Sequence, residues 1–263
     1  MDNEIPRRPA HEESSLSVQA RGTLHTVFYN DRGLRAGWRL VIYILLVAIF
    51  STLVNLALDK IFHLPKTATP APWQFFLQES LLFILVFLPA CVMAQMERRP
   101  VGDYGLPLDS LFGVRFWQGC VLGVVEVVVL MGCIAIFGGY SFGPLNVHGA
   151  AIFKWALFWA LFFVVVGLFE EFTFRGFLMQ GLAMLFGGSR SAWIVACLLQ
   201  GALFGLAHAY QNPLGIAITG TLGVLMGLLV LATGRNLWPV IIGHGLFDAS
   251  RFVLFYFEGP PTG

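Results

Sequence analysis

The chain has 263 residues, of which 57% are hydrophobic and only 12% are charged. Average soluble domains carry roughly 25% charged residues, so a soluble fold of this size could not cover its apolar core, and the composition indicates a protein surrounded by lipid. The formal net charge of +1 provides neither a basic field for nucleic acid nor an acidic field for a cationic partner.

The first 36 residues are too polar to cross a bilayer as a helix. Residues 1–22 mix acidic and basic side chains among polar ones, which predicts a disordered N-terminal tail. Residues 23–36 (TLHTVFYNDRGLRA) contain aromatic residues and arginines. They are either an interfacial segment ahead of the first helix or a plain extension of the tail.

Long apolar runs make up most of the remaining chain. A transmembrane helix needs about 20 mostly apolar residues, and about seven such runs are separated by polar or Gly/Pro-marked connections. They cover residues 39–58, 73–96, 114–137, 151–169 and onward, 191–208, 213–232 and 237–257. The sequence therefore predicts an all-α fold, a polytopic membrane helix bundle of about seven transmembrane helices. Residues 23–149 would hold the interfacial segment and the first three of these helices.

The distribution of basic residues predicts the orientation in the membrane. If the N-terminus is inside, that side holds most of the arginines of the connections, whereas the other side holds only Lys60, Lys66 and Lys154. The positive-inside rule therefore favours a cytoplasmic N-terminus. Because no eukaryotic sorting signal is visible, we expect a prokaryotic plasma membrane as the location.

One apolar stretch is too long for a simple crossing. From Ala151 to Phe186 only isolated glycines interrupt it, and as a helix it would extend roughly 54 Å against a hydrocarbon core of about 30 Å. It must therefore tilt strongly, break or emerge from the bilayer. Glu170, Glu171 and Arg175 lie in its middle, where such a distortion would matter most.

Ionisable residues inside apolar helices are costly and suggest a functional site by default. Here they are Glu79, Glu126, Glu170, Glu171, Arg175, His208, His244, Asp248 and Arg251. Glu79 and Glu126 belong to no motif, and we interpret them as structural. The four cysteines lie in apolar stretches without the spacing of a metal site or a disulfide framework.

The spacing of the remaining residues predicts which of their side chains share a helix face or a depth in the membrane. Glu171 and Arg175 are four residues apart and can pair on one helix face, while Glu170 points about 100° away from Glu171. Glu170 and His208 would reach a similar depth on neighbouring antiparallel helices and could hold one water between them. His244 fits this depth less well, so a tilt or a partial break must bring it close.

Three short motifs follow one another on successive predicted helices. They read FEEFTFRG at 169–176, FGLAH at 204–208 and HGLFD at 244–248. A Glu-Glu pair with Arg four residues on, then Phe-x-x-x-His, then His-x-x-x-Asn/Asp resembles the type II CAAX prenyl endopeptidase family, also called CPBP or Abi. Residues 98–108 (RRPVGDYGLPL) resemble the connecting loop of that family. The resemblance implies that residues 150–257 form a CPBP-like catalytic membrane domain.

The resemblance also implies a role for each motif residue. Glu170 would be the general base and His208 its partner in activating a water, while His244 and Asp248 would stabilise the oxyanion. Glu171, Arg175 and Phe204 would be supporting residues. A carboxylate donates a hydrogen bond only when protonated, so two further roles stay open for Asp248, orienting His244 or pairing with Arg251. The expected substrate is a membrane-associated peptide or protein, prenylated or bacteriocin-like.

Two alternatives accompany this interpretation. Glu170, His208 and His244 are legitimate zinc ligands, although a water held by Glu and His needs no metal, and we expect no cofactor. A non-catalytic membrane immunity or binding protein, or a transporter, could use the same bundle. A transporter predicts internal repeats with broken helices in corresponding positions, and the sequence has no such symmetry.

Overall fold

The computed structural model describes residues 27–30, 33–61, 71–138 and 148–253. The long helices are α2 (Ala36–Ile61), α3 (Pro72–Glu97), α4 (Val114–Ile136), α5 (Ala150–Glu171), α7 (Arg190–Ala207), α8 (Pro213–Ala232) and α9 (Trp238–Val253). The shorter elements are the antiparallel strands β1 (Tyr29–Asn30) and β2 (Gly33–Leu34), the 3₁₀ turns η1 (Val101–Tyr104) and η2 (Leu108–Ser110), the π-helical segment η3 (Phe172–Leu178) and α6 (Met179–Leu185). The predicted all-α membrane bundle is confirmed, and the predicted tail lies outside the described residues.

Within the described part of the chain, six helical stretches are long and apolar enough to cross a membrane. They coincide with the first six predicted runs, and the chain is an integral membrane protein. The seventh prediction, 237–257, corresponds to α9, whose described part has 16 residues.

Local chemistry explains several helix boundaries. Pro72 and Pro213 open α3 and α8, and the side chains of Ser189 and Asn212 cap α7 and α8 by accepting backbone N–H groups.

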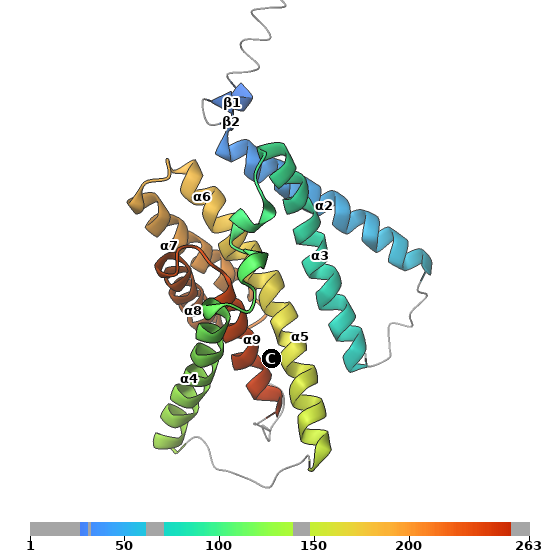
Figure 1. The fold of residues 1–263 in the computed structure, drawn as a ribbon, viewed down its shortest axis with the longest axis vertical. Coiled ribbons are helices and arrows are strands. Elements are labelled where there is room, and N and C mark those ends of the chain that lie inside the picture. The colour runs from blue at the N-terminus through green and yellow to red at the C-terminus, as the bar shows by residue number, and fades with distance from the viewer. Residues whose placement is uncertain (1–26, 31–32, 62–70, 139–147, 254–263) are drawn as a thin grey trace, which may run out of the picture.

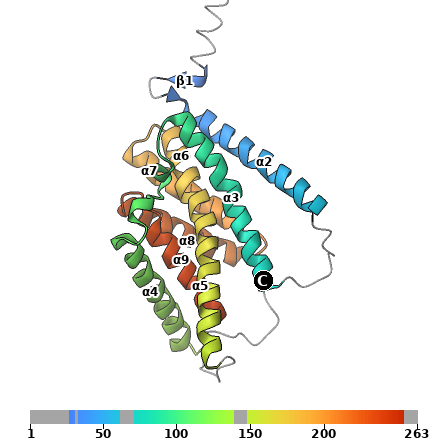
Figure 2. The same ribbon diagram turned by 45° about the vertical axis from the view of Figure 1, so that its right-hand side comes forward.

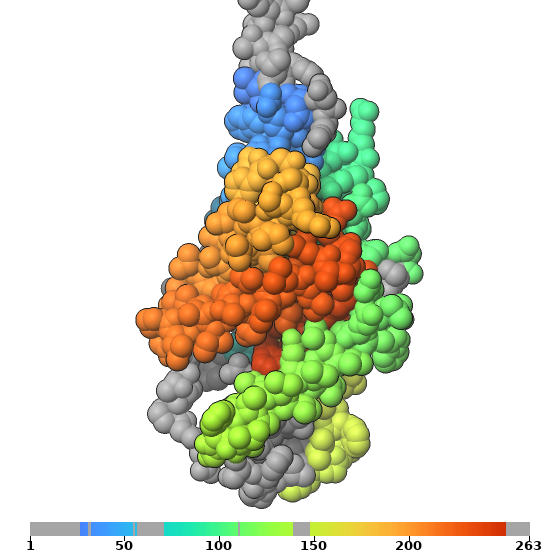
Figure 3. All heavy atoms as spheres, turned by 90° about the vertical axis from the view of Figure 1, so that its left-hand side faces the viewer, coloured from blue at the N-terminus to red at the C-terminus, as the bar shows by residue number. Residues whose placement is uncertain are grey.

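Helix α9 lies between α4 and α5 (Figures 1 and 2). Glycines allow this close approach, because a Cβ on Gly123 of α4 would lie 2.9 Å from the carbonyl oxygen of Gly243 in α9. A Cβ on Gly167 of α5 would meet the carbonyl oxygen of Ile241 at the same distance. On the face drawn in Figure 3, α8 and α4 leave only a small patch of α9 visible. Small residues thus let backbones pack at van der Waals distance, as in many membrane helix pairs.

Helices α7 and α8 form a second glycine-mediated pair. A Cβ on Gly205 of α7 would lie 2.6 Å from the carbonyl oxygen of Ile216, and one on Gly201 would lie 2.9 Å from the backbone nitrogen of Val224. The opposing residue of α8 is often glycine as well, with Gly220 3.0 Å from the Gly205 position. Because the two backbones touch, polar side chains of α7 can reach carbonyl groups of α8.

The long stretch predicted to tilt, break or emerge remains a helix but changes its winding. Residues Ala150–Leu185 run through α5, η3 and α6, and the π-helical part begins directly after Glu171. A π-turn closes i→i+5 rather than i→i+4 hydrogen bonds and is frequent at functional sites. The distortion therefore falls where the Glu-Glu-x-x-x-Arg motif lies.

The connection between α3 and α4 packs on this distorted segment. The ring of Tyr104 is buried, and its centroid lies 5.0 Å from that of Phe177 in η3. A Cβ on Gly176 would lie 2.8 Å from the Tyr104 carbonyl oxygen, so only glycine fits there. Burial raises the pKa of Tyr104 to about 12. The indole of Trp238 at the start of α9 donates to the Pro107 carbonyl at 3.0 Å.

Candidate active site

The three sequence motifs converge in one place. Glu170 lies in the last turn of α5, His208 follows the last turn of α7, and His244 and Asp248 lie one turn apart on α9. The side chains of Glu170, His208, His244 and Asp248 are 18%, 17%, 16% and 23% exposed, so each retains some access from outside the bundle. The structure thus brings together all four residues that the sequence proposed for chemistry.

The two oxygens of Glu170 face different histidines. Oε1 lies 4.0 Å from Nε2 of His208, and Oε2 lies 3.8 Å from Nε2 of His244. Both separations exceed the length of a direct hydrogen bond. They suit a single water bridging each pair of atoms, which is the first arrangement to consider for polar groups at this distance.

His208 is oriented by its own helix. Its Nδ1 lies 2.8 Å from the carbonyl oxygen of Phe204, one turn earlier. A carbonyl oxygen only accepts, so Nδ1 carries a proton, and in the neutral form of the ring Nε2 is the unprotonated nitrogen that faces Glu170. The ring also packs on that of Phe204, with centroids 4.7 Å apart. Phe204, a predicted supporting residue, therefore fixes both the tautomer and the tilt of His208.

His244 is held between carboxylates. Nδ1 lies 2.9 Å from Oε1 of Glu171, while Nε2 lies 3.2 Å from Oδ2 of Asp248. A ring whose two nitrogens both face carboxylate oxygens can donate from both when it is an imidazolium. Of the roles left open for Asp248, its short contact favours orienting His244, and the pairing with Arg251 falls on a side chain outside the described part of the structure.

Glu171 and Arg175 are fully enclosed. Nη1 of Arg175 lies 3.1 Å from Oε1 of Glu171, and the two side chains are 1% and 0% exposed. Nη2 donates to the carbonyl oxygen of Gly223 in α8 at 3.3 Å, and the guanidinium carbon lies 4.3 Å from the ring centroid of Phe204. Charge, hydrogen bonding and ring stacking thus fix Arg175, which in turn fixes the carboxylate that holds His244.

Sequence reasoning missed Gln200. Its Nε2 donates to the Gly223 carbonyl oxygen at 2.9 Å and to the Cys197 carbonyl oxygen at 3.1 Å, and the residue is fully buried. Arg175 and Gln200 therefore share one carbonyl group of α8. The available signal was an amide four residues before Phe204, on the same face of an otherwise apolar helix.

Glu79 and Glu126, interpreted from the sequence as structural, lie within electrostatic reach of the site. Glu79 of α3 interacts with Glu170, and Glu126 of α4 interacts with His244. Both come from helices that precede the motif-bearing half of the chain. Their position shows that the charge environment of the site is not determined by the three motifs alone.

The zinc alternative names Glu170, His208 and His244 as ligands. Among the described residues, no group of three or more His, Cys, Asp or Glu side chains is arranged to hold a metal ion. Whether Glu170, His208 and His244 bind zinc stays a prediction.

Comparison with known proteins adds one finding. Residues 152–250 match the family model described as type II CAAX prenyl endopeptidase Rce1-like. This range contains all three motifs and the four converging residues. Neither the curated proteins nor the solved structures gave a significant match.

Proposed function

Because residues 152–250 belong to the Rce1-like family of type II CAAX prenyl endopeptidases, we propose that this CAAX-type membrane protease cleaves its substrate with a water activated by Glu170 and His208. The observation that carries the proposal is the carboxylate of Glu170, which faces Nε2 of His208 at 4.0 Å and Nε2 of His244 at 3.8 Å. A water lying beside either pair could hydrogen-bond to both of its atoms.

In the proposed reaction Glu170 is the general base. The water donates hydrogen bonds to Glu170 and to the unprotonated Nε2 of His208, and its oxygen attacks the scissile carbonyl carbon as one proton passes to Glu170. The carbonyl oxygen becomes an oxyanion as the C=O double bond becomes a single bond. The C–N bond then breaks, the carbonyl re-forms, and Glu170 returns the proton to the departing nitrogen. The products are a peptide carboxylic acid and an amine, which exchange the remaining water proton to become a carboxylate and an ammonium group, with no covalent enzyme intermediate.

His244 stabilises the oxyanion in this scheme through the positive charge of its imidazolium, because the single hydrogen on its Nε2 faces Asp248. Its Nδ1 hydrogen bond to Glu171 at 2.9 Å fixes the ring, and its Nε2 faces the space beside Glu170. Asp248, 3.2 Å from Nε2, orients the ring and stabilises its charged form. A fixed cation in a site shielded from bulk water stabilises developing negative charge strongly.

We propose that the substrate is a membrane-associated peptide segment, prenylated or bacteriocin-like, and that cleavage needs no metal. We also propose that the N-terminus is cytoplasmic, because of the arginine bias of the connections, and that the membrane is a prokaryotic plasma membrane. A peptide with a hydrophobic anchor would concentrate in the same bilayer and approach the partly exposed side chains from the membrane boundary.

The test is cleavage of a quenched peptide library by detergent-purified protein, with prenylated and unprenylated members. Glu170→Gln should lose at least about 100-fold in rate, the range expected for a general base. Asp109→Asn, the same change at an exposed carboxylate of the α3–α4 connection, should keep full activity. Wild-type activity in Glu170→Gln would refute the mechanism, and loss of cleavage with a strong chelator would restore the zinc alternative.

A further inference from the structure

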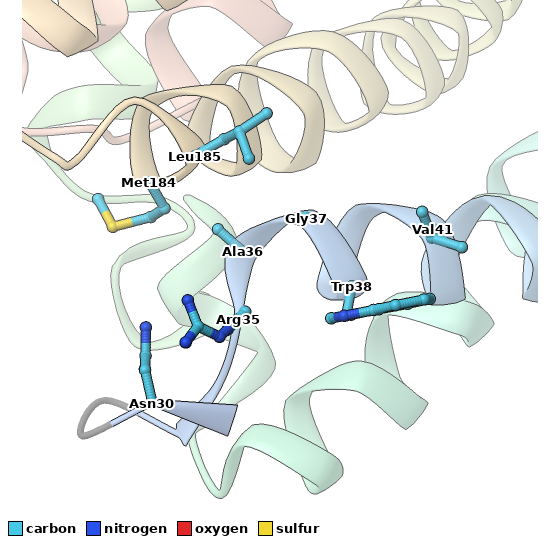
Figure 4. A pocket seen from close by; sticks show the side chains of 8 residues that line it. All are labelled: Asn30, Arg35, Ala36, Gly37, Trp38, Val41, Met184 and Leu185. Carbon is cyan, nitrogen blue, oxygen red and sulfur yellow. The ribbon is translucent and has the colours of Figure 1, made fainter. Parts of the chain in front are cut away.

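The surface pocket drawn in Figure 4 is separate from the candidate active site. Its lining comes from side chains between residues 30 and 41 and from Met184 and Leu185 at the end of α6. The four converging residues lie outside this lining, and their side chains are partly exposed. A substrate therefore reaches them from another part of the surface.

Tyr210 is an exposed aromatic residue beside the candidate active site. It is 75% exposed, and its ring centroid lies 5.7 Å from that of His208, with the two ring planes tilted by 43°. His208 packs on Phe204, and Phe204 packs on Phe174 of η3, with centroids 5.0 Å apart. Tyr210 is therefore the exposed end of a series of four rings, which includes the ring proposed to activate the water.

The turn that carries Tyr210 is held on both sides. The backbone N–H of Gln211 donates to the carbonyl oxygen of His208 at 2.9 Å, which closes the turn after α7. The side chain of Asn212 caps α8, and the hydroxyl of Thr219 donates to Oε1 of Gln211 at 3.2 Å. Because these bonds fix the backbone around Tyr210, a substrate that binds its ring would not have to order the turn.

The same turn connects two candidate membrane spans. The span in α7 ends at Ala207, and the span in α8 begins at Pro213. Tyrosine is common at membrane boundaries, because its apolar ring and polar hydroxyl suit the two surroundings. Anchoring at the boundary would explain the exposure of Tyr210, but it would not require contact with the ring of His208.

We propose that Tyr210 binds an aromatic side chain of the substrate directly beside the scissile bond, and so selects which peptides are cleaved. The inference rests on the proposed function, in which His208 contacts the attacking water. A ring that touches His208 is close enough to the bond under attack to contact a side chain that flanks it. An aromatic partner fits best, because aromatic pairs are stabilised beyond the area that they bury.

The test uses pairs of quenched peptides, taken from the cleaved members of the library, that carry phenylalanine or alanine on one side of the scissile bond. Wild-type protein should favour phenylalanine on one side by about ten-fold in kcat/KM. Tyr210→Ala should reduce this ratio to near one, mainly through a higher KM for the phenylalanine peptide, whereas Tyr210→Phe should preserve it. Phe112→Ala is the matched control, because Phe112 is 71% exposed in the α3–α4 connection, and it should also preserve the ratio.

A binding measurement separates this proposal from the proposed mechanism. Fluorescence anisotropy of labelled phenylalanine and alanine members of the library would be recorded with Glu170→Gln, which keeps the ring of Tyr210. The phenylalanine peptides should bind about ten-fold more tightly, and adding Tyr210→Ala should remove the difference. A wild-type protein that cleaved no peptide would contradict the proposed function, while the anisotropy would still decide whether Tyr210 selects aromatic peptides.

Four outcomes would overturn the proposal. Three of them are equal cleavage of both peptides by wild type, an unchanged preference in Tyr210→Ala, and an equal loss of preference in Phe112→Ala. The last of these would show only that exposed aromatic residues anchor the protein at the membrane boundary. The fourth is equal slowing of both peptides in Tyr210→Ala, which would show that Tyr210 orients His208 without contacting the substrate.

Discussion

Removing the guanidinium of Arg175 is the most informative perturbation of the buried network. Arg175→Met keeps the length and apolar stem of the side chain but removes the positive charge that lies 3.1 Å from Glu171. The carboxylate of Glu171 would then be buried beside His244 alone. The Gly223 carbonyl would lose one of its two donors, and Phe204 would lose the stacked cation.

The expected cost follows from the burial of both partners. Breaking a fully buried ion pair by removing one member costs about 3–5 kcal/mol, because an uncompensated charge remains inside. For a chain of this size each kcal/mol lowers Tm by about 2–4 °C, so Arg175→Met should melt roughly 6–20 °C below wild type. Glu171→Gln should also be destabilising, since it leaves the Arg175 charge uncompensated.

A double-mutant cycle separates this pair from general damage. Thermal unfolding in detergent would be measured for wild type, Glu171→Gln, Arg175→Met and the double variant. The double variant should be clearly more stable than the sum of the single losses predicts, because neither charge remains buried alone. Additive losses, within about 0.5 kcal/mol, would mean that these side chains do not form the buried pair. The double variant should still cleave slowly, because a neutral amide stabilises His244 less than a carboxylate does.

Two other changes probe the elements around the site. Gln200→Leu removes a donor from the Gly223 carbonyl and should lower the free energy of unfolding by about 1–3 kcal/mol. It should also reduce kcat more than it alters KM, which steady-state kinetics and melting of the same preparation would check. An unchanged kcat would show that Gln200 does not position Arg175. Tyr104 has a pKa raised to about 12 by burial, so its stabilising contribution should be complete below about pH 10 and lost between about pH 10 and 12. Melting curves across that range should therefore fall less steeply for Tyr104→Phe than for wild type.

Much of the fold was predictable because its signals are local. Runs of about 20 apolar residues separated by breakers such as Pro72, Pro213 and the Gly187–Gly188 pair fix where helices begin and end. The i,i+4 spacings of Glu171 with Arg175 and of His244 with Asp248 predict pairs that the structure contains. Residues four apart on one helix are neighbours wherever that helix packs, so their pairing does not depend on the tertiary structure.

The parts that were not predictable depend on packing between helices. No proline marks η3, and Tyr104, which packs on this π-helical segment at Gly176, comes from a connection more than 70 residues away. The depth of His244 in the membrane was predicted less well than that of Glu170 and His208. It depends on how α9 packs against α4 and α5, and these contacts cannot be read from the sequence. The sharing of one α8 carbonyl by Arg175 and Gln200 likewise requires the contact of α7 with α8.

The candidate site is therefore completed by parts of the chain that precede the family match at 152–250. Helix α4 covers α9 through Gly123, and the connection before α4 covers η3 through Tyr104. Glu79 and Glu126 add charge from α3 and α4. In the proposed mechanism the motifs supply the reacting groups, while α4 packs against α9 and the α3–α4 connection packs against η3. Variation in the first half of the chain should consequently alter activity without changing any motif residue.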